Sequence, residues 1–253
     1  MKHSISHREH GLSLIELMVA LLLSTLLILG ITQLYVDNKR NYLFQQGQSD
    51  NLENARYALL LFEEELYRAG YRSRSDDDFE NLFRAEISEN CNFAAGEVIK
   101  YNADEQVICL RYQPGLPEIT SCDGATLSGG SVPYAANVEP VITELQITDN
   151  TLLCNGTPLI DNLVDIQILF GTSPEGVRET EKFKAEPEAS DLLRSIRYAV
   201  LLKSRGTNLA DDNSSLAYTA WQEKWHDVAG ATPPDRALYF STENTLTLRN
   251  LAR

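Results

Sequence analysis

The chain has 253 residues, 43% of them hydrophobic, which is enough to build the core of one large domain or of two small ones. Its formal net charge is −14 at pH 7. A protein this acidic repels nucleic-acid phosphates, so we expect no direct binding to nucleic acid. A basic partner or a divalent cation would complement its charge better.

The amino-terminal part begins with a short polar segment, residues 1–11, which is mildly basic. An apolar run follows from Leu12 to Val36, and Glu16 is the one charged residue in it. The twenty uncharged residues from Leu17 to Val36 can cross a hydrocarbon layer as a helix about 30 Å long. The basic segment is expected to stay on the cytoplasmic side of the membrane.

Glu16 distinguishes between the possible interpretations of this segment. A secretory signal peptide fits badly, because no small-residue cleavage site follows the apolar run. A plain signal anchor fits the length of the run but gives no reason for Glu16. An ionised carboxylate in an apolar helix costs several kcal/mol unless it is paired or protonated, so Glu16 requires a partner.

The sequence Gly11-Leu12-Ser13-Leu14-Ile15-Glu16 resembles the leader junction of type IV prepilins and of type II secretion pseudopilins. The resemblance implies that a membrane prepilin peptidase cuts between Gly11 and Leu12. It also implies that Leu12 is then methylated, and that Glu16 pairs with the amino terminus of a neighbouring subunit during assembly. Such a pair costs far less in hydrocarbon than either ion alone. The sequence departs from the family pattern at Leu12, where phenylalanine is commoner, and at Gln33, where major pilins usually have proline.

We expect one long helix over residues 12–69, because no proline occurs before Pro114 and Gly70 is a suitable C-cap. After the apolar run, small and apolar residues repeat at spacings of three and four and so form one helix face. They are Leu52, Ala55, Leu59, Phe62, Leu66 and Ala69. This face is predicted to dock a globular head.

Residues 70–253 contain short strand-like runs separated by turns, which predicts one antiparallel β-sheet domain on the second half of the helix. The runs are Val98–Asn102, Gln106–Gln113, Val141–Thr148, Thr151–Cys154, Asn162–Phe170, Ser195–Lys203 and Thr245–Asn250. Asp149-Asn150 is a candidate tight turn. The expected fold class is α+β, with a cleaved leader (1–11), a stem helix with a transmembrane first half (12–69) and a periplasmic head (70–253).

Four cysteines lie in the head: Cys91, Cys109, Cys122 and Cys154. An even number beyond a membrane segment suits two disulfides in an oxidising compartment. Three pairings are possible, and proximity in the sequence favours Cys91–Cys109 and Cys122–Cys154. The alternative is four buried free thiols.

The sequence contains no pattern typical of an enzyme or of a cofactor site. It has no Walker motif, no GxGxxG and no HExxH, and His226 is the one histidine left after leader removal, so we expect no catalysis, no zinc and no cofactor. His226 is expected in a surface turn or short helix. The acidic clusters Asp76–Asp78 with Glu80 and Asp211–Asn213 lack the spacing of a calcium loop, so we interpret them as solvated loops. Trp221 and Trp225 are expected to pack, and a partner-binding spot is the alternative.

The later part of the chain resembles PilW-type minor pilins in particular. The segments that carry this resemblance are Leu153–Gly156, Pro158–Gly171, Ile196–Ser204 and Leu246–Asn250. The resemblance implies a minor pilin that initiates or caps type IV pilus assembly near the tip and so supports motility, adhesion or DNA uptake. A J-type pseudopilin of a type II secretion system is the alternative, and a periplasmic enzyme with an uncleaved membrane anchor is a third hypothesis.

The resemblance also implies partners and a location. The expected partners are other minor pilins, the major pilin, the prepilin peptidase, the inner-membrane assembly platform and a tip adhesin. The chain would first cross the inner membrane once, with its head in the periplasm, and would then enter the extracellular pilus at its tip.

Overall fold

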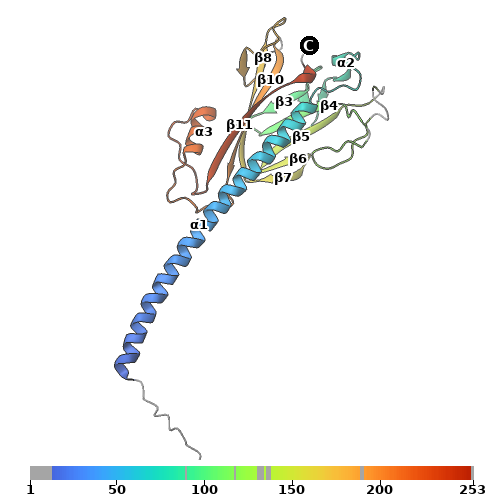
Figure 1. Ribbon diagram of the computed structural model, residues 1–253. Coiled ribbons are helices and arrows are strands. Elements are labelled where there is room, and N and C mark those ends of the chain that lie inside the picture. Colours follow the sequence, from blue (N-terminus) through green and yellow to red (C-terminus); the bar gives the residue numbers. More distant parts are fainter. Residues whose placement is uncertain are drawn as a thin grey trace, which may run out of the picture. The chain divides into compact units, whose positions relative to one another are not determined.

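The computed structural model describes residues 13–88, 90–116, 118–129, 134, 138–188 and 191–251. The expected leader, with Gly11, and the expected first mature residue, Leu12, lie outside the described residues. The chain divides into two compact units, Met1–Gln46 and Gly47–Arg253. The long helix α1 (Leu14–Arg68) contributes to both of them (Figure 1).

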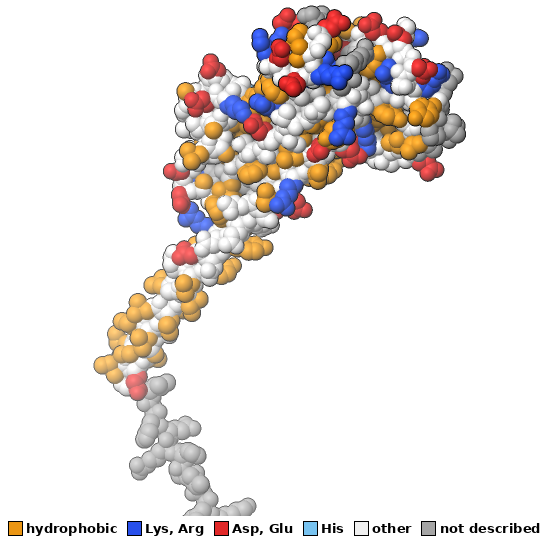
Figure 2. Space-filling view, turned by 45° about the horizontal axis from the view of Figure 1, so that its top comes forward, with side chains coloured by type: hydrophobic (Ala, Val, Ile, Leu, Met, Phe, Trp, Pro, Cys, Tyr) orange, Lys and Arg blue, Asp and Glu red, His pale blue; other side chains and the backbone are white. Residues whose placement is uncertain are grey.

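In the first unit, α1 is an exposed apolar helix, as predicted. Its large hydrophobic side chains from Leu14 to Val36 are each at least 52% exposed, and Figure 2 shows them covering this part of the helix. Ser24, Thr25 and Thr32 donate their hydroxyl hydrogens to backbone carbonyls of the preceding turn. The helix is long and apolar enough to cross a membrane. It therefore offers hydrocarbon an almost unbroken apolar surface.

In the second unit, α1 packs through a face that differs in part from the predicted one. Leu52 is 44% exposed and Leu59 is half-buried, so the prediction was wrong for Leu52. The buried positions of α1 are Gly47, Asn51, Ala55, Ala58, Leu61, Phe62, Glu65 and Leu66. This face includes two polar residues, because each of them has a bonding partner in the fold.

The first contacts of this face explain the rotation away from Leu52. Asn51 Nδ2 donates a hydrogen bond to the Leu238 carbonyl at 2.7 Å, which turns the polar side chain inward. Gly47 lies against the loop that follows strand β10 (Leu192–Lys203), where an added Cβ would come within 2.8 Å of Leu209 Cδ1 and 3.2 Å of Ser204 Cβ. The close packing at Gly47 and the buried side-chain amide of Asn51 therefore determine which face of α1 packs against the head.

The end of α1 is capped as the sequence predicts. Gly70 has φ +69°, the left-handed conformation that glycine adopts readily, and its N–H donates to the Arg111 carbonyl at 2.8 Å. Asn250 Nδ2 donates to the carbonyls of Tyr67 and Ala69. The last turn of the helix is thus bonded to residues far away in the sequence.

The head is antiparallel, as predicted, but it contains two larger sheets rather than one. The first has the order β3-β4-β5-β6-β7, with bounds Ile99–Asn102, Val107–Tyr112, Val141–Thr148, Thr151–Cys154 and Thr157–Asp161. The second has the order β11-β10-β8-β9, with bounds Tyr239–Thr247, Leu192–Lys203, Leu163–Ser173 and Lys182–Lys184. A two-stranded ribbon pairs β1 (Glu86–Ile87) with β2 (Asn92–Phe93).

The two sheets separate at Asn162, which has φ +61° between β7 and β8. Strand β8 then pairs with β10 and β9 and not with β7. Hydrogen bonds still join the sheets: Tyr101 Oη donates to the Ile166 carbonyl at 2.6 Å, and the Ile166 N–H donates to Gln106 Oε1 at 2.9 Å. One hydrophobic core accordingly contains residues of α1 and of both sheets.

Most predicted strands are confirmed, with changed ends. The Asp149-Asn150 turn has positive φ at both residues (52° and 58°), which suits a two-residue hairpin loop. The Thr245–Asn250 prediction was wrong in its bounds, because β11 ends at Thr247 and Arg249–Leu251 forms a 3-10 helix. Two short helices complete the fold: α2 (Phe79–Leu82) and α3 (Leu216–His226).

Candidate functional site

The start of α1 is the candidate assembly site. Ser13 precedes the helix, and its backbone N–H donates to Glu16 Oε2 at 3.0 Å. Glu16 therefore reaches back to the helix start as half of a capping box, where a carboxylate also complements the helix dipole. Among the described residues, Ser13 is its one hydrogen-bond partner, so Oε1 remains available to a cation from another chain.

The head holds both disulfides that sequence proximity favours. Cys91 is bonded to Cys109 and Cys122 to Cys154, with Cα–Cα distances of 5.7 and 6.1 Å. The first bridge joins the residue before β2 to β4, and the second joins the loop after β4 to the end of β6. No free cysteine remains in the part of the chain that the structure describes.

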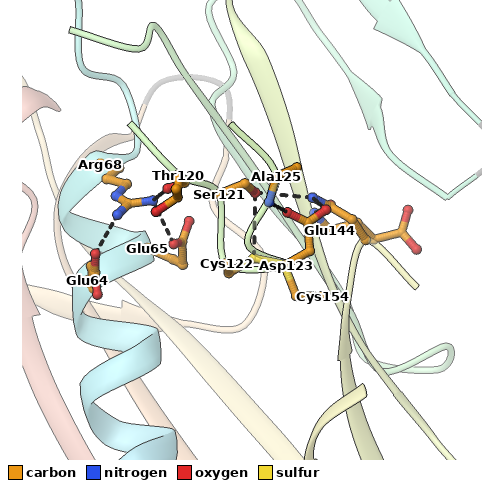
Figure 3. Close-up of a disulfide and its surroundings, with 11 residues drawn as sticks. Glu64, Glu65, Arg68, Thr120, Ser121, Cys122, Asp123, Ala125, Glu144 and Cys154 are labelled. Carbon is orange, nitrogen blue, oxygen red and sulfur yellow. Dashed lines mark hydrogen bonds and ion pairs between the residues drawn. A yellow bond between two sulfur atoms is a disulfide. The ribbon is translucent and has the colours of Figure 1, made fainter. Parts of the chain in front are cut away.

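The second disulfide lies beside a charged cluster on α1 (Figure 3). Arg68 Nη1 donates to Glu65 Oε1 at 3.0 Å and to the Thr120 carbonyl at 3.1 Å, and Arg68 also pairs with Glu64. Thr120 precedes Cys122 by two residues. The disulfide and Arg68 thus hold the same loop, one against β6 and the other against the helix.

Glu65 is the member of this cluster whose charge is least favoured by its surroundings. It is 1% exposed, and burial raises its pKa, whereas the Arg68 guanidinium acts in the opposite direction. Burial prevails over the Arg68 guanidinium and over a contact with the Thr143 hydroxyl, which also lowers the pKa of Glu65. This contact is weak, because neither Glu65 Oε2 nor Thr143 Oγ1 has a well-formed hydrogen bond among the described residues. The negative charges of Glu64 and of Asp123 also raise the pKa.

Replacing Glu65 with glutamine should make the protein more stable at neutral pH and remove one source of its pH dependence. The pKa of Glu65 is raised above 4.5 in the folded protein. The protonated carboxyl therefore makes its full contribution to the free energy of unfolding below pH 4.5, and this contribution is lost as the pH rises through the pKa of the folded protein. Glu65→Gln keeps the acceptor for Arg68 and offers Thr143 a donor. Urea unfolding at several pH values should show a gain of about 1–2 kcal/mol at pH 7.5 and little or none at pH 4.

Glu64→Gln is the matched control, because Glu64 also pairs with Arg68 but its side chain is 62% exposed. Its effect should stay below about 0.5 kcal/mol at every pH. A stability difference between Glu65→Gln and the wild type that does not change with pH would contradict the assignment.

The tryptophans and the histidine that the sequence singled out hold helix α3 in place. Trp221 is buried, and its Nε1 donates to Asp165 Oδ2 at 2.6 Å, the same oxygen that His226 Nε2 contacts at 2.7 Å. His226 is the last residue of α3, so it helps to fix this helix to β8. Trp225 packs against Trp221 with ring centroids 5.8 Å apart.

The acidic clusters also form local contacts. Asp76 and Asp77 pair with Arg74, and Asp78 caps α2 by accepting from the Asn81 N–H. Asp212 accepts from the Ser214 hydroxyl. Among the described residues, no group of three or more acidic, histidine or cysteine side chains is arranged to hold a metal ion.

The sequence analysis missed Glu65, although a signal for it was present. The series Ala55, Ala58, Phe62, Glu65 and Ala69 has the spacing of one helix face, and Glu65 occupies one of its steps. A search for apolar residues at this spacing passes over Glu65, because it is charged. A charged residue at such a step predicts a partner of opposite charge, here the half-buried Arg68.

Comparisons with known proteins add information on the first unit. Residues 6–32 match the family model described as the prokaryotic N-terminal methylation motif. The structure is similar to the type IV-like pilin TTHA1219 from Thermus thermophilus, with a TM-score of 0.42 and 14% identity over 79% of this chain and 98% of that chain. A search of curated proteins gives no significant match. The amino-terminal segment therefore carries a prepilin-type methylation motif, and its match includes Gly11, Leu12 and Glu16.

Proposed function

We propose that this chain is a minor pilin of the PilW type, a membrane-inserted subunit that initiates or caps a type IV pilus. The observation that carries the proposal is the methylation motif at residues 6–32, which continues into an apolar helix exposed along its whole first part. A motif and a helix of this kind favour a structural subunit over an enzyme. The interactions at the helix start supply the chemistry of assembly.

In this proposal, the prepilin peptidase cuts between Gly11 and Leu12, and Leu12 is methylated. The cut creates a terminal amino group close in sequence to Glu16. The free Oε1 of Glu16 then accepts a hydrogen bond from the terminal ammonium of a neighbouring subunit. This ion pair offsets the free energy that an unpaired carboxylate would cost among apolar helices. Assembly would thus be coupled to cleavage.

The arrangement of the head supports the PilW type within this class. The segments that resemble PilW-type proteins lie mainly in β7, β8, β10 and the end of β11. Strands β8, β10 and β11 are neighbours in one sheet, so most of the resemblance lies in one structural unit, while β7 belongs to the other sheet. The proposed partners are other minor pilins, the major pilin, the assembly platform of the inner membrane and a tip adhesin.

Amino-terminal sequencing and intact mass of the membrane-extracted protein, with and without the prepilin peptidase, test the proposal. We expect a chain that starts at methylated Leu12 only when the peptidase is present. A chain that still starts at Met1, or is cut beyond Val36, would show that the protein is a signal anchor or a secreted domain instead.

The Glu16→Gln variant should be cut and methylated normally, because Glu16 is proposed to act in assembly. It should be depleted from filaments sheared off the cells.

Cross-linking in cells separates the two filament systems. Cross-links to pilus subunits, together with loss of surface pili in a deletion strain, would support the minor pilin. Cross-links to type II secretion components with normal pili would instead assign a J-type pseudopilin.

A further inference from the structure

Three side chains on one face of α1 mark the end of the apolar run. Tyr35, Lys39 and Tyr42 are separated by four and three residues, so they lie on the same side of the helix. The tyrosines are 66% and 65% exposed, and Lys39 is exposed as well. Within the described residues, Lys39 forms no ion pair, so its charge is available to an external anion.

The chemistry of these residues fits a phospholipid headgroup layer. Tyrosine places an apolar ring and a polar hydroxyl at a membrane boundary, and lysine extends its ammonium toward phosphates. The rise from Tyr35 to Tyr42 is about 10 Å, slightly more than the roughly 5–8 Å of the headgroup region on one side of a bilayer, so the two tyrosines span this region. One tyrosine thus reaches each edge of this layer, with Lys39 between them.

The same register places Glu16 at the other boundary. From Glu16 to Tyr35 the helix rises about 28 Å, close to the hydrocarbon thickness of about 30 Å. Hydropathy alone does not fix this depth, because Leu43 and Phe44 are also exposed apolar residues. A deeper position would draw Asp37 and Lys39 into hydrocarbon, so the charged residues select the register.

We propose that Tyr35, Lys39 and Tyr42 form an interfacial anchor for phospholipid headgroups, and that this anchor holds Glu16 at the opposite boundary of the hydrocarbon layer. The inference rests on the proposed function in requiring that α1 is in a membrane. An anchored helix keeps the Glu16 carboxylate hydrated before assembly. The carboxylate enters an apolar environment only when the subunit leaves the bilayer and a neighbour pairs with it.

Fluorescence quenching in vesicles tests the depth. The full chain is reconstituted into phosphatidylethanolamine and phosphatidylglycerol vesicles that carry a spin label at the headgroup, the upper acyl chain or the chain end. Single variants Leu26→Trp, Tyr35→Trp and Tyr42→Trp report three depths. Trp221 and Trp225 fluoresce in every variant, and the wild-type chain in the same vesicles measures their contribution.

We expect Leu26→Trp to be quenched most by the chain-end label, Tyr35→Trp by the upper-chain label and Tyr42→Trp by the headgroup label. In each case the matching label should quench at least about twofold more than the others. Adding Lys39→Leu should raise the quenching of Tyr35→Trp by the chain-end label about twofold relative to the upper-chain label, a limited shift because Asp37 still opposes a deeper position. Lys39→Arg should leave this ratio unchanged.

The outcomes separate the inference from the proposed function. If no lipid label quenches Leu26→Trp, the helix is not in the bilayer and the proposed function fails too. If Leu26→Trp is quenched at the chain end, the anchor is refuted by a deep maximum for Tyr35→Trp, by an unquenched Tyr42→Trp, or by no shift with Lys39→Leu.

Discussion

Replacing Arg111 with methionine is expected to lower the free energy of unfolding by about 3–5 kcal/mol, the largest effect of any single substitution considered for this chain. Arg111 is 1% exposed and lies on β4. Its guanidinium donates to four backbone carbonyls that precede β3: Phe83, Arg84, Ala94 and Glu97. It also lies 4.2 Å from the centre of the Phe93 ring.

This cost arises from the carbonyls more than from the charge. Burial lowers the pKa of Arg111, while the negative charges of Glu86 and Glu97 act in the opposite direction, so the site tolerates the cation without being strongly favourable to it. Methionine fills similar space but donates nothing, and each carbonyl left buried without a donor costs about 1–3 kcal/mol. The segment that contains α2 and the β1–β2 ribbon would lose these hydrogen bonds to β4 and would be held there mainly by the Cys91–Cys109 disulfide.

Urea unfolding of the full chain in detergent micelles, followed by circular dichroism, measures the loss. Hydrogen exchange should accelerate most in residues 79–98 and least in β8 and β10. Arg111→Lys is the matched control, because it keeps the charge but reaches fewer carbonyls, so an intermediate loss is expected. A loss below about 1 kcal/mol, with uniform exchange, would show that the carbonyls find other donors.

Removing the Cys122–Cys154 disulfide should cost about 3–4 kcal/mol, because this bridge closes the longer of the two loops, with a separation of 32 residues against 18. Alanine is the suitable replacement at both positions. Cys154 is completely buried in the main core, where a serine hydroxyl would lack a partner. The freed loop would also lose its hold on Arg68, since Thr120 belongs to it.

The double variant Cys91→Ala and Cys109→Ala is the comparison, with an expected cost of about 3 kcal/mol. Urea unfolding of both double variants with and without a reductant distinguishes the bridges. The reductant should lower the free energy of unfolding of each double variant by breaking the one disulfide that this variant retains. Equal stability of the wild type and the Cys122/Cys154 variant would mean that the loop is held by Arg68 and its own contacts alone.

The sequence was sufficient to predict the elements whose signals are local. The unbroken apolar run from Leu17 to Val36, with proline absent before Pro114, predicts the long helix, and Gly70 supplies its end. The strand-like runs on both sides of the Asp149-Asn150 turn predict the β5–β6 hairpin, because its strands are adjacent in the chain. The proximity of the cysteines likewise favoured the observed pairs.

Features that depend on distant residues could not be obtained in this way. Nothing in the neighbourhood of Arg111 predicts that its donors meet carbonyls from a segment 14–28 residues earlier. The separation into two sheets depends on β8 pairing with β10, whose residues lie beyond an intervening strand and loop. Leu52 looked like a core residue, and only the contact of Asn51 with Leu238 shows that the helix is turned away from it.

The sequence by itself determined the chemistry of the amino-terminal part: a mildly basic polar segment, a methylation motif that includes Gly11, Leu12 and Glu16, and an apolar helix of membrane-spanning length. These depend on residue order along one helix, where neighbours in sequence are neighbours in space. The tertiary structure alone decided which face of α1 is buried, that Glu65 and Arg111 are interior, and how the head divides into sheets. Those outcomes result from long-range hydrogen bonds and burial, which arise only when separate segments pack together.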